Sequence, residues 1–186
     1  MASASLPKGV DLPDTRHVNG IKLQRNGHGI RSISFYGMNV KVYVAGFYTE
    51  VPLTSEADVL ECRDSPMQLD FTFLRSFNKD RVIAAWVKQL EHSVSYRYDG
   101  YEKDRDSLIE MLSSPIAYGG TQTVILIGGD APHTVVIDQE NHKGIIPGRE
   151  FQQAFLSMWF GERAVAEDLK NGLLNDAVHH RAAAVA

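Results

Sequence analysis

Residues 27–48 read GHGIRSISFYGMNVKVYVAGFY, and this stretch decides the fold. It is rich in β-branched and aromatic residues and is broken by glycines, a composition typical of strands and turns. Within residues 40–45, three valines alternate with Lys, Tyr and Ala, which is the period-two pattern of a half-buried strand. We therefore predict a β-hairpin in which residues 30–35 pair with residues 39–48 around Gly37.

The predicted hairpin brings an arginine and a tyrosine together. If its loop has an odd length and is centred on Gly37, Arg31 and Tyr43 lie opposite each other on one face, about 5 Å apart at Cβ. A loop one residue shorter would send them to opposite faces, so the prediction depends on register. A guanidinium beside a phenol suits a carboxylate or another oxyanion, because Arg offers two parallel donors and Tyr a third. The alternative is that Arg31 pairs with one of the 23 acidic residues on a solvated face.

The remaining sequence predicts further strands and a set of helices. Asn78 fits a helix N-cap, and the apolar residues from Val82 to Val94 share one helical face. Gly27 and Gly29 are interpreted as allowing the chain to turn between two strands. The order of strands, helices, a hairpin and helices indicates an α+β fold, with one mainly antiparallel sheet and helices on one face. The other predicted strands cover residues 18–24, 67–74, 122–127 and 133–139, and the other predicted helices cover residues 101–112, 149–160 and 165–173.

Length and composition exclude several classes of protein. The chain has 186 residues, enough for one ordinary domain. We predict a single domain over residues 16–176, an N-terminal extension over residues 1–15 and a flexible C-terminal tail over residues 177–186. The net charge is −4 and the 19 Lys and Arg residues are scattered, so we expect no nucleic-acid partner. No apolar run reaches the length of a membrane span, and no targeting segment is evident, which favours a soluble, cytoplasmic protein.

Common catalytic and metal-binding motifs are absent from the sequence. It contains no nucleophile elbow, no zinc-protease helix, no P-loop and no dinucleotide-binding glycine motif. The seven histidines do not fall at metal-ligand spacing, and the single cysteine, Cys62, is interpreted as structural. We therefore expect no metal and no cofactor.

Three separated segments resemble the chalcone isomerase fold family. They are GHGIR at residues 27–31, VKVYVAGFY at residues 40–48 and FLSMWFGERAVAEDLKNGLL at residues 155–174. The resemblance runs in order over residues 19–174, nearly the whole chain. It implies an open-faced β-sandwich, in which a long antiparallel sheet is covered by a layer of helices and the ligand cleft lies between them.

The resemblance to the isomerases of this family fails at most active-site positions. Arg31 matches the arginine that stabilises the developing oxyanion, but Tyr43 stands where the enzymes have a threonine. Asn78 and Ala85 stand where they have a tyrosine and an asparagine, and Met158 replaces a threonine or serine. Only one of the five positions matches, which argues against catalysis.

The fatty-acid-binding branch of the family is a better match. Its members resemble this chain in having both the arginine and a tyrosine twelve residues later, and there the pair holds the carboxylate of a fatty acid. We therefore predict a non-catalytic binder of a fatty acid or similar amphiphilic carboxylate, held by Arg31 and Tyr43. The protein is expected to be a monomer or weak dimer. The candidate pocket walls are the helical residues Trp86, Phe155, Met158 and Trp159.

Two other functions remain open at this point. The chain could be an isomerase or lyase that uses Arg31, with Tyr43, for oxyanion stabilisation. It could instead be a scaffold or partner protein that uses the same fold. Arg75, at the end of a predicted strand, either reaches the mouth of the same cleft or stays solvated, and solvation is the more common outcome.

Overall fold

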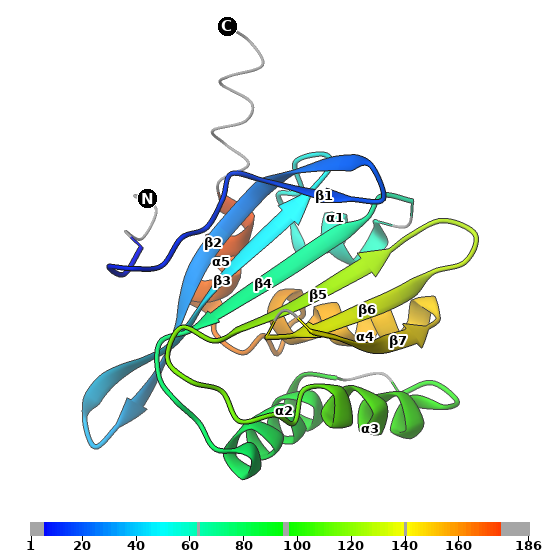
Figure 1. The fold of residues 1–186 in the computed structure, drawn as a ribbon. Helices are drawn as coiled ribbons and strands as arrows, with labels where there is room; N and C mark the ends of the chain where they lie inside the picture. The colour runs from blue at the N-terminus through cyan, green and yellow to red at the C-terminus, as the bar shows by residue number, and fades with distance from the viewer. Residues whose placement is uncertain (1–5, 63, 95–96, 140, 176–186) are drawn as a thin grey trace, which may run out of the picture.

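The computed structural model describes residues 6–62, 64–94, 97–139 and 141–175. Its centre is one antiparallel sheet of seven strands whose order in space is their order in the chain, so that each strand pairs with the next (Figure 1). This meander leaves β1 and β7 as the two edges. The strands are β1 (Thr15–Val18), β2 (Ile21–Phe35), β3 (Met38–Thr49), β4 (Met67–Phe73), β5 (Thr121–Ile127), β6 (His133–Asp138) and β7 (Asn141–Pro147).

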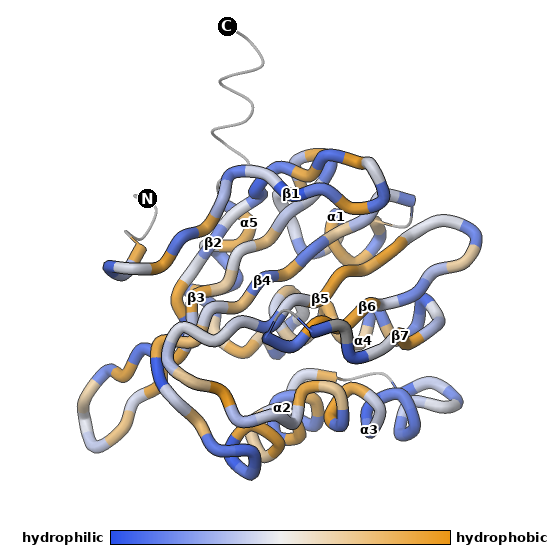
Figure 2. Tube along the Cα trace, in the orientation of Figure 1, coloured by the Kyte–Doolittle hydropathy of each residue, from blue (hydrophilic) through white to orange (hydrophobic). Residues whose placement is uncertain are grey.

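Five helices cover one face of the sheet and leave the other face open (Figure 1). This arrangement confirms the predicted α+β, open-faced sandwich. In Figure 2, α2 and α3 each mix hydrophobic and hydrophilic residues along their length, as helices do when they bury only one side. The helices are α1 (Glu56–Glu61), α2 (Lys79–Ser93), α3 (Tyr101–Met111), α4 (Arg149–Phe160) and α5 (Glu167–Asn175).

The start of α2 is set by the predicted N-cap. The side chain of Asn78 accepts a hydrogen bond from the backbone N–H of Arg81, and Asp80 lies in the first turn. Val82 and Leu90 are buried, so this helix buries one apolar side, as the periodicity indicates. The cap thereby fixes where the residues of α2 stand relative to β3 and β4.

The β2–β3 hairpin pairs Arg31 with Tyr43 as predicted, but through a different geometry. The turn has only two residues, Tyr36 and Gly37, both with positive φ (48° and 75°), as a type I′ turn requires. This shorter loop would send the pair to opposite faces. A β-bulge at Val42, opposite the step from Arg31 to Ser32, adds one residue and restores the register.

The interpretation of Gly27 and Gly29 as a turn is wrong, because both lie within the continuous strand β2. The turn before β2 is at Asn19 and Gly20, which have positive φ. Gly27 instead permits close packing: a Cβ there would lie 2.3 Å from the carbonyl oxygen of Gly172 in α5. A Cβ on Gly172 would in turn lie 2.5 Å from the carbonyl oxygen of His28. These glycines let α5 lie directly on β2.

The chain also contains elements that the sequence pattern did not predict, namely α1, β1 and β7. β1 begins at Thr15, and Leu12 before it is buried, so part of the segment predicted as an extension packs on the sheet. The predicted tail, residues 177–186, lies outside the described residues.

Candidate ligand-binding site

A cavity of about 410 Å³ lies between the sheet and the helical layer, in the size range of small-molecule sites. Most of its lining is apolar or aromatic. On the helical side it is closed by α2 and by Trp159 of α4, and the exposed residues Arg81 and Lys88 of α2 stand where it meets the surface. The strands contribute Arg31, Ile33, Val42, Tyr43, Phe71 and Phe73.

Arg31 reaches this cavity from β2, on the helix-facing side of the sheet. Its side chain is half-buried, and Nη1 donates to the backbone carbonyl oxygen of Ser32. Among the described residues Arg31 forms no ion pair with a carboxylate. The alternative in which it pairs with an acidic residue on a solvated face therefore has no support in the described part of the chain.

Tyr43 lies beside Arg31 and contributes a phenol to the same cavity. Its hydroxyl oxygen accepts a hydrogen bond from Nε1 of Trp159 at 3.2 Å. Burial raises the pKa of Tyr43 to about 12, although the Trp159 hydrogen bond and the nearby positive charge of Arg31 act in the opposite direction. The phenol is therefore neutral at physiological pH, and its O–H proton has no acceptor among the described residues.

An aromatic wall continues from Tyr43 into the interior. The ring of Tyr43 packs edge-on against Phe71, with 5.4 Å between the ring centroids, and the centroid of Phe71 lies 5.2 Å from that of Trp159. The ring centroids of Trp86, in α2, and Trp159 are 6.0 Å apart. Such rings are held in place by their mutual contacts and offer an apolar surface with one polar end, at Arg31 and Tyr43.

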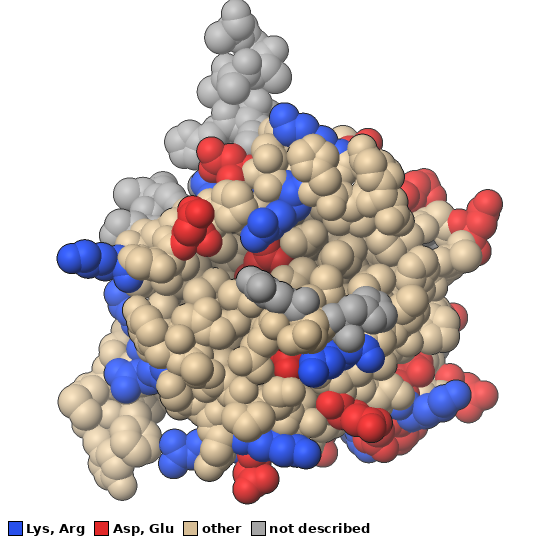
Figure 3. Space-filling model, in the orientation of Figure 1, with Lys and Arg blue, Asp and Glu red and all other residues tan. Residues whose placement is uncertain are grey.

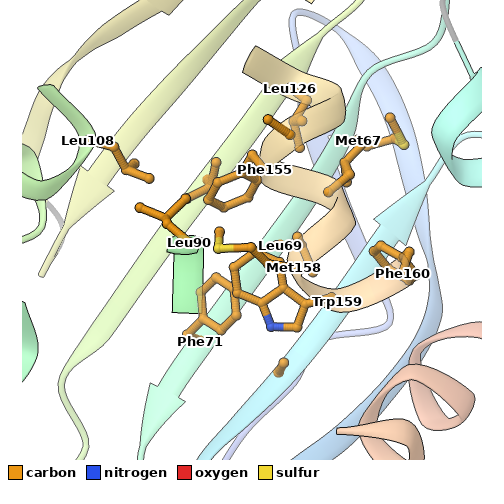
Figure 4. Packing of buried hydrophobic residues seen from close by; sticks show 14 of the residues in the cluster. Met67, Leu69, Phe71, Leu90, Leu108, Leu126, Phe155, Met158, Trp159 and Phe160 are labelled. Atoms are coloured by element: carbon orange, nitrogen blue, oxygen red, sulfur yellow. The ribbon is translucent and has the colours of Figure 1, made fainter. Parts of the chain in front are cut away.

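The four predicted wall residues separate into two groups. Trp86 and Trp159 line the cavity, whereas Phe155 and Met158 are not among its lining residues and are fully buried. Figure 4 shows Phe155 and Met158 on α4, packed among leucines of the core. Met158 precedes Trp159 directly and therefore points to another side of α4. Phe155 shares the face of Trp159 one turn earlier, but it is packed against the rings of both Trp86 and Trp159, inside the core.

Arg75 is exposed and does not line the cavity. Two other cations, Arg81 and Lys88, do line it, and the sequence analysis missed them. They are seven residues apart on α2 and therefore share a face of the helix. This spacing can be seen in the sequence, but it indicates a ligand site only once that face is known to border the cavity. With Arg31 they place three cations around a cavity whose described lining contains no acidic residue, so the electrostatics favour an anionic ligand.

No cluster of three or more potential metal ligands occurs among the described residues. Within the same part of the chain, no helix combines the length and the hydropathy that a bilayer span requires.

Comparison with known proteins identifies the family. The sequence profile described as "chalcone isomerase-like" matches residues 4–175, almost the entire chain. This chain belongs to the chalcone isomerase-like family. The structure is also similar to the crystal structure of a fatty-acid-binding protein from Arabidopsis thaliana, with a TM-score of 0.74 and 19% sequence identity over 95% of this chain and 97% of that chain. At this identity the similarity shows a shared fold. No curated protein sequence gives a significant match.

The structure places the side chains that the family resemblance aligns with isomerase active-site positions. Ala85 lines the cavity with a methyl group, and the side chain of Asn78 is engaged in capping α2. Ser157 donates its hydroxyl proton to the backbone carbonyl of Ala154 within α4, and Met158 is buried in the core. Apart from Arg31 and Tyr43, none of these aligned positions presents a polar side chain to the cavity.

Proposed function

We propose that this chalcone isomerase-like protein binds a fatty acid or a similar amphiphilic carboxylate without transforming it. In this proposal Arg31 and the O–H of Tyr43 donate hydrogen bonds to the carboxylate. The acyl chain follows the aromatic wall formed by Phe71, Trp86 and Trp159.

One observation carries the proposal: a half-buried arginine without an acidic partner among the described residues stands beside a neutral phenol, at the polar end of an apolar cavity. Partial burial of an uncompensated guanidinium is unfavourable, and a carboxylate ligand removes that cost while accepting charge-assisted hydrogen bonds. A neutral Tyr43 can donate to a carboxylate, whereas a phenolate would repel it.

Two further facts support the proposal. The similar structure from Arabidopsis thaliana is that of a fatty-acid-binding protein and has the same fold. The apolar Ala85 and the engaged side chains of Asn78 and Ser157 leave few polar groups for polarising a ketone substrate. A binding role is therefore better supported than an isomerase role.

The two tryptophans of the chain supply a direct assay, because both line the cavity. We expect added long-chain fatty acid to change the intrinsic fluorescence in a saturable way. The Arg31→Gln variant should bind about a hundredfold more weakly, since hydrogen bonds to a charged group are lost. The matched control is Arg75→Gln, an exposed arginine outside the cavity, which should bind like the parent protein.

Native mass spectrometry of the freshly purified protein provides a second measurement. A co-purified fatty acid that is absent from the Arg31→Gln variant would support the proposal. An unliganded protein that takes up no added fatty acid would overturn it and favour a scaffold role. Conversion of chalcone to flavanone that depends on Arg31 would instead establish the isomerase alternative.

A further inference from the structure

The β2–β3 hairpin extends beyond the sheet to which it belongs. β4 pairs with β3 only from Tyr43 onward, and β1 pairs with β2 only as far as Gln24. Residues 32–41 therefore form a two-stranded ribbon that pairs only with itself. Figure 1 shows this ribbon projecting from the body of the protein, near the start of α2.

The tip of the ribbon is apolar and exposed. The exposed fractions are 41% for Ile33, 56% for Phe35, 90% for Tyr36 and 62% for Met38. These four account for half of the large exposed hydrophobic residues in the described part of the chain, and all lie at the end of one hairpin. The rings of Phe35 and Tyr36 pack edge-on, with 4.6 Å between their centroids. A concentration of apolar side chains at a projecting point indicates an interaction site rather than scattered surface variation.

Basic residues predominate near the tip, although the exposed Asp80 lies beside Arg81 at the start of α2. The ribbon contains Lys41 and no acidic residue, and Lys41 is exposed. Arg81 and Lys88 are also exposed and line the same cavity as Ile33, so they stand at the base of the ribbon. Figure 3 shows the tip as an uncharged lobe at the lower left, with Lys and Arg residues and an acidic group along the adjoining surface.

We propose that this hairpin tip docks on a lipid surface that carries anionic headgroups. Aromatic and apolar side chains at a projecting turn can enter the boundary between headgroups and acyl chains, and Tyr is favoured there because it has an apolar ring and a polar end. Lysine and arginine at the base would then face the negative headgroups, with each cation near the surface adding to the affinity.

The shape of the tip favours a lipid surface over a second copy of the chain. A stable protein interface needs about 800 Å² from each partner, far more than one turn of a two-stranded ribbon offers. Insertion into a lipid interface requires only a few apolar side chains supported by charge.

Docking at the tip would place the cavity close to the lipid. Ile33 belongs both to the ribbon and to the cavity lining, so an amphiphile could pass between the two along one continuous apolar surface. This consequence rests on the proposed binding function, whereas the docking itself does not.

Co-sedimentation with vesicles tests the inference. The protein is mixed with vesicles of phosphatidylcholine alone or of equal parts of phosphatidylcholine and phosphatidylglycerol. We expect binding to the mixed vesicles and a loss of about tenfold or more in the triple variant Phe35→Thr, Tyr36→Asn, Met38→Thr. These substitutions keep strand and type I′ turn preferences, so the hairpin is retained.

Matched variants separate the contributions. Val51→Ser removes an exposed apolar side chain just beyond the opposite end of β3 and should leave vesicle binding unchanged. Lys41→Gln should weaken binding to the anionic vesicles by about fivefold and have little effect on phosphatidylcholine vesicles. Arg31→Gln should lose fatty-acid binding but keep vesicle binding. The triple variant should keep fatty-acid binding, measured without vesicles. The failure of one proposal is therefore distinguishable from the failure of the other.

Three results would overturn the inference. The parent protein could fail to bind either kind of vesicle, or the triple variant could bind as well as the parent. The third is self-association that depends on the tip in sedimentation velocity, without vesicle binding, which would assign this surface to a second copy.

Discussion

Arg31 beside Tyr43 and Arg16 above Tyr48 lie on opposite faces of the sheet, and the two arginines differ in the acidic partner that they meet. Both tyrosines belong to β3: Tyr43 packs against the helix-side core, and Tyr48 packs with Val18 and Leu23 on the other face. Their odd and even positions place them on opposite sides of the strand. Arg31 lies opposite Tyr43, whereas Arg16 lies 5.4 Å above the ring of Tyr48.

The arginine on the open face has its acidic partner within the protein, although the buried hydroxyl of Tyr48 forms no hydrogen bond among the described residues. Arg16 donates to a carboxylate oxygen of Asp70 at 2.7 Å, and the other oxygen of Asp70 accepts from Gln68 and Thr123. The positive charge is thus compensated by a buried, fully hydrogen-bonded carboxylate. This arrangement has the character of a structural ion pair.

The pair on the helix face has no such carboxylate in the described part of the chain. Arg31 donates only to a backbone carbonyl, and Tyr43 accepts from Trp159. An arginine with an internal acid stabilises the fold, whereas an arginine without one remains able to bind an acid from outside. The comparison therefore separates a residue that serves stability from a residue that serves binding.

The largest effect is expected from removing the carboxylate on the open face. Asp70→Ala should lower the free energy of unfolding by about 3 kcal/mol, because Arg16, Gln68 and Thr123 lose a shared acceptor. Arg31→Ala should change it by less than about 0.5 kcal/mol. Urea denaturation measures both. Asp70→Asn should recover part of the loss, since its amide oxygen can still accept, and equal destabilisation by Asp70→Ala and Arg31→Ala would remove the distinction between the two pairs.

A smaller effect is expected at alkaline pH from the tyrosine of the helix face. The folded protein holds the Tyr43 proton up to a pKa of about 12, whereas the unfolded chain releases it near 10.0. Stability is therefore fully present below pH 10 and falls as the pH rises toward 12, because the unfolded state binds fewer protons.

The Tyr43→Phe variant isolates this contribution. It should reduce the alkaline loss of stability by about 2 kcal/mol, measured by urea denaturation across this pH window. A residual loss is expected from Tyr48, because burial and the charge of Asp70 also raise its pKa. An alkaline loss of the same size in Tyr43→Phe and the parent would show that Tyr43 does not titrate as described.

The smallest effect is expected from placing an acid in the cavity. Ala85→Asp should weaken fatty-acid binding by about tenfold, because a carboxylate in the lining repels the ligand and offers Arg31 an internal partner. Tryptophan fluorescence titration measures the change. The control is Ala84→Asp on the same helix, outside the cavity lining, which should bind like the parent. Equal affinities of the two variants would argue against a carboxylate binding in this cavity.

The elements with strong local signals could be predicted from the sequence. The apolar period and the Asn78 cap correctly predict α2, and the pattern over residues 149–160 matches α4. The short elements α1 and β1 were missed because a few residues do not establish a period. β7 is as long as β4, but its sequence NHKGIIP contains Asn, Gly and Pro and does not alternate in a strand-like way. The family resemblance added the layered architecture, which periodicity alone does not specify.

Within the candidate site, the sequence by itself determined that Arg31 and Tyr43 belong to one hairpin, because alternation and turn residues are local properties. Tertiary structure decided the rest. The bulge at Val42 sets their common face, and side-chain direction on α4 assigns Trp159 to the cavity and Met158 to the core. Tertiary structure also decides that Arg16 has an acidic partner and Arg31 has none among the described residues. Asp70 lies far from Arg16 in the sequence and meets it only because β1 and β4 belong to the same sheet. A charge acquires its partner through packing, and packing is a property of the whole chain.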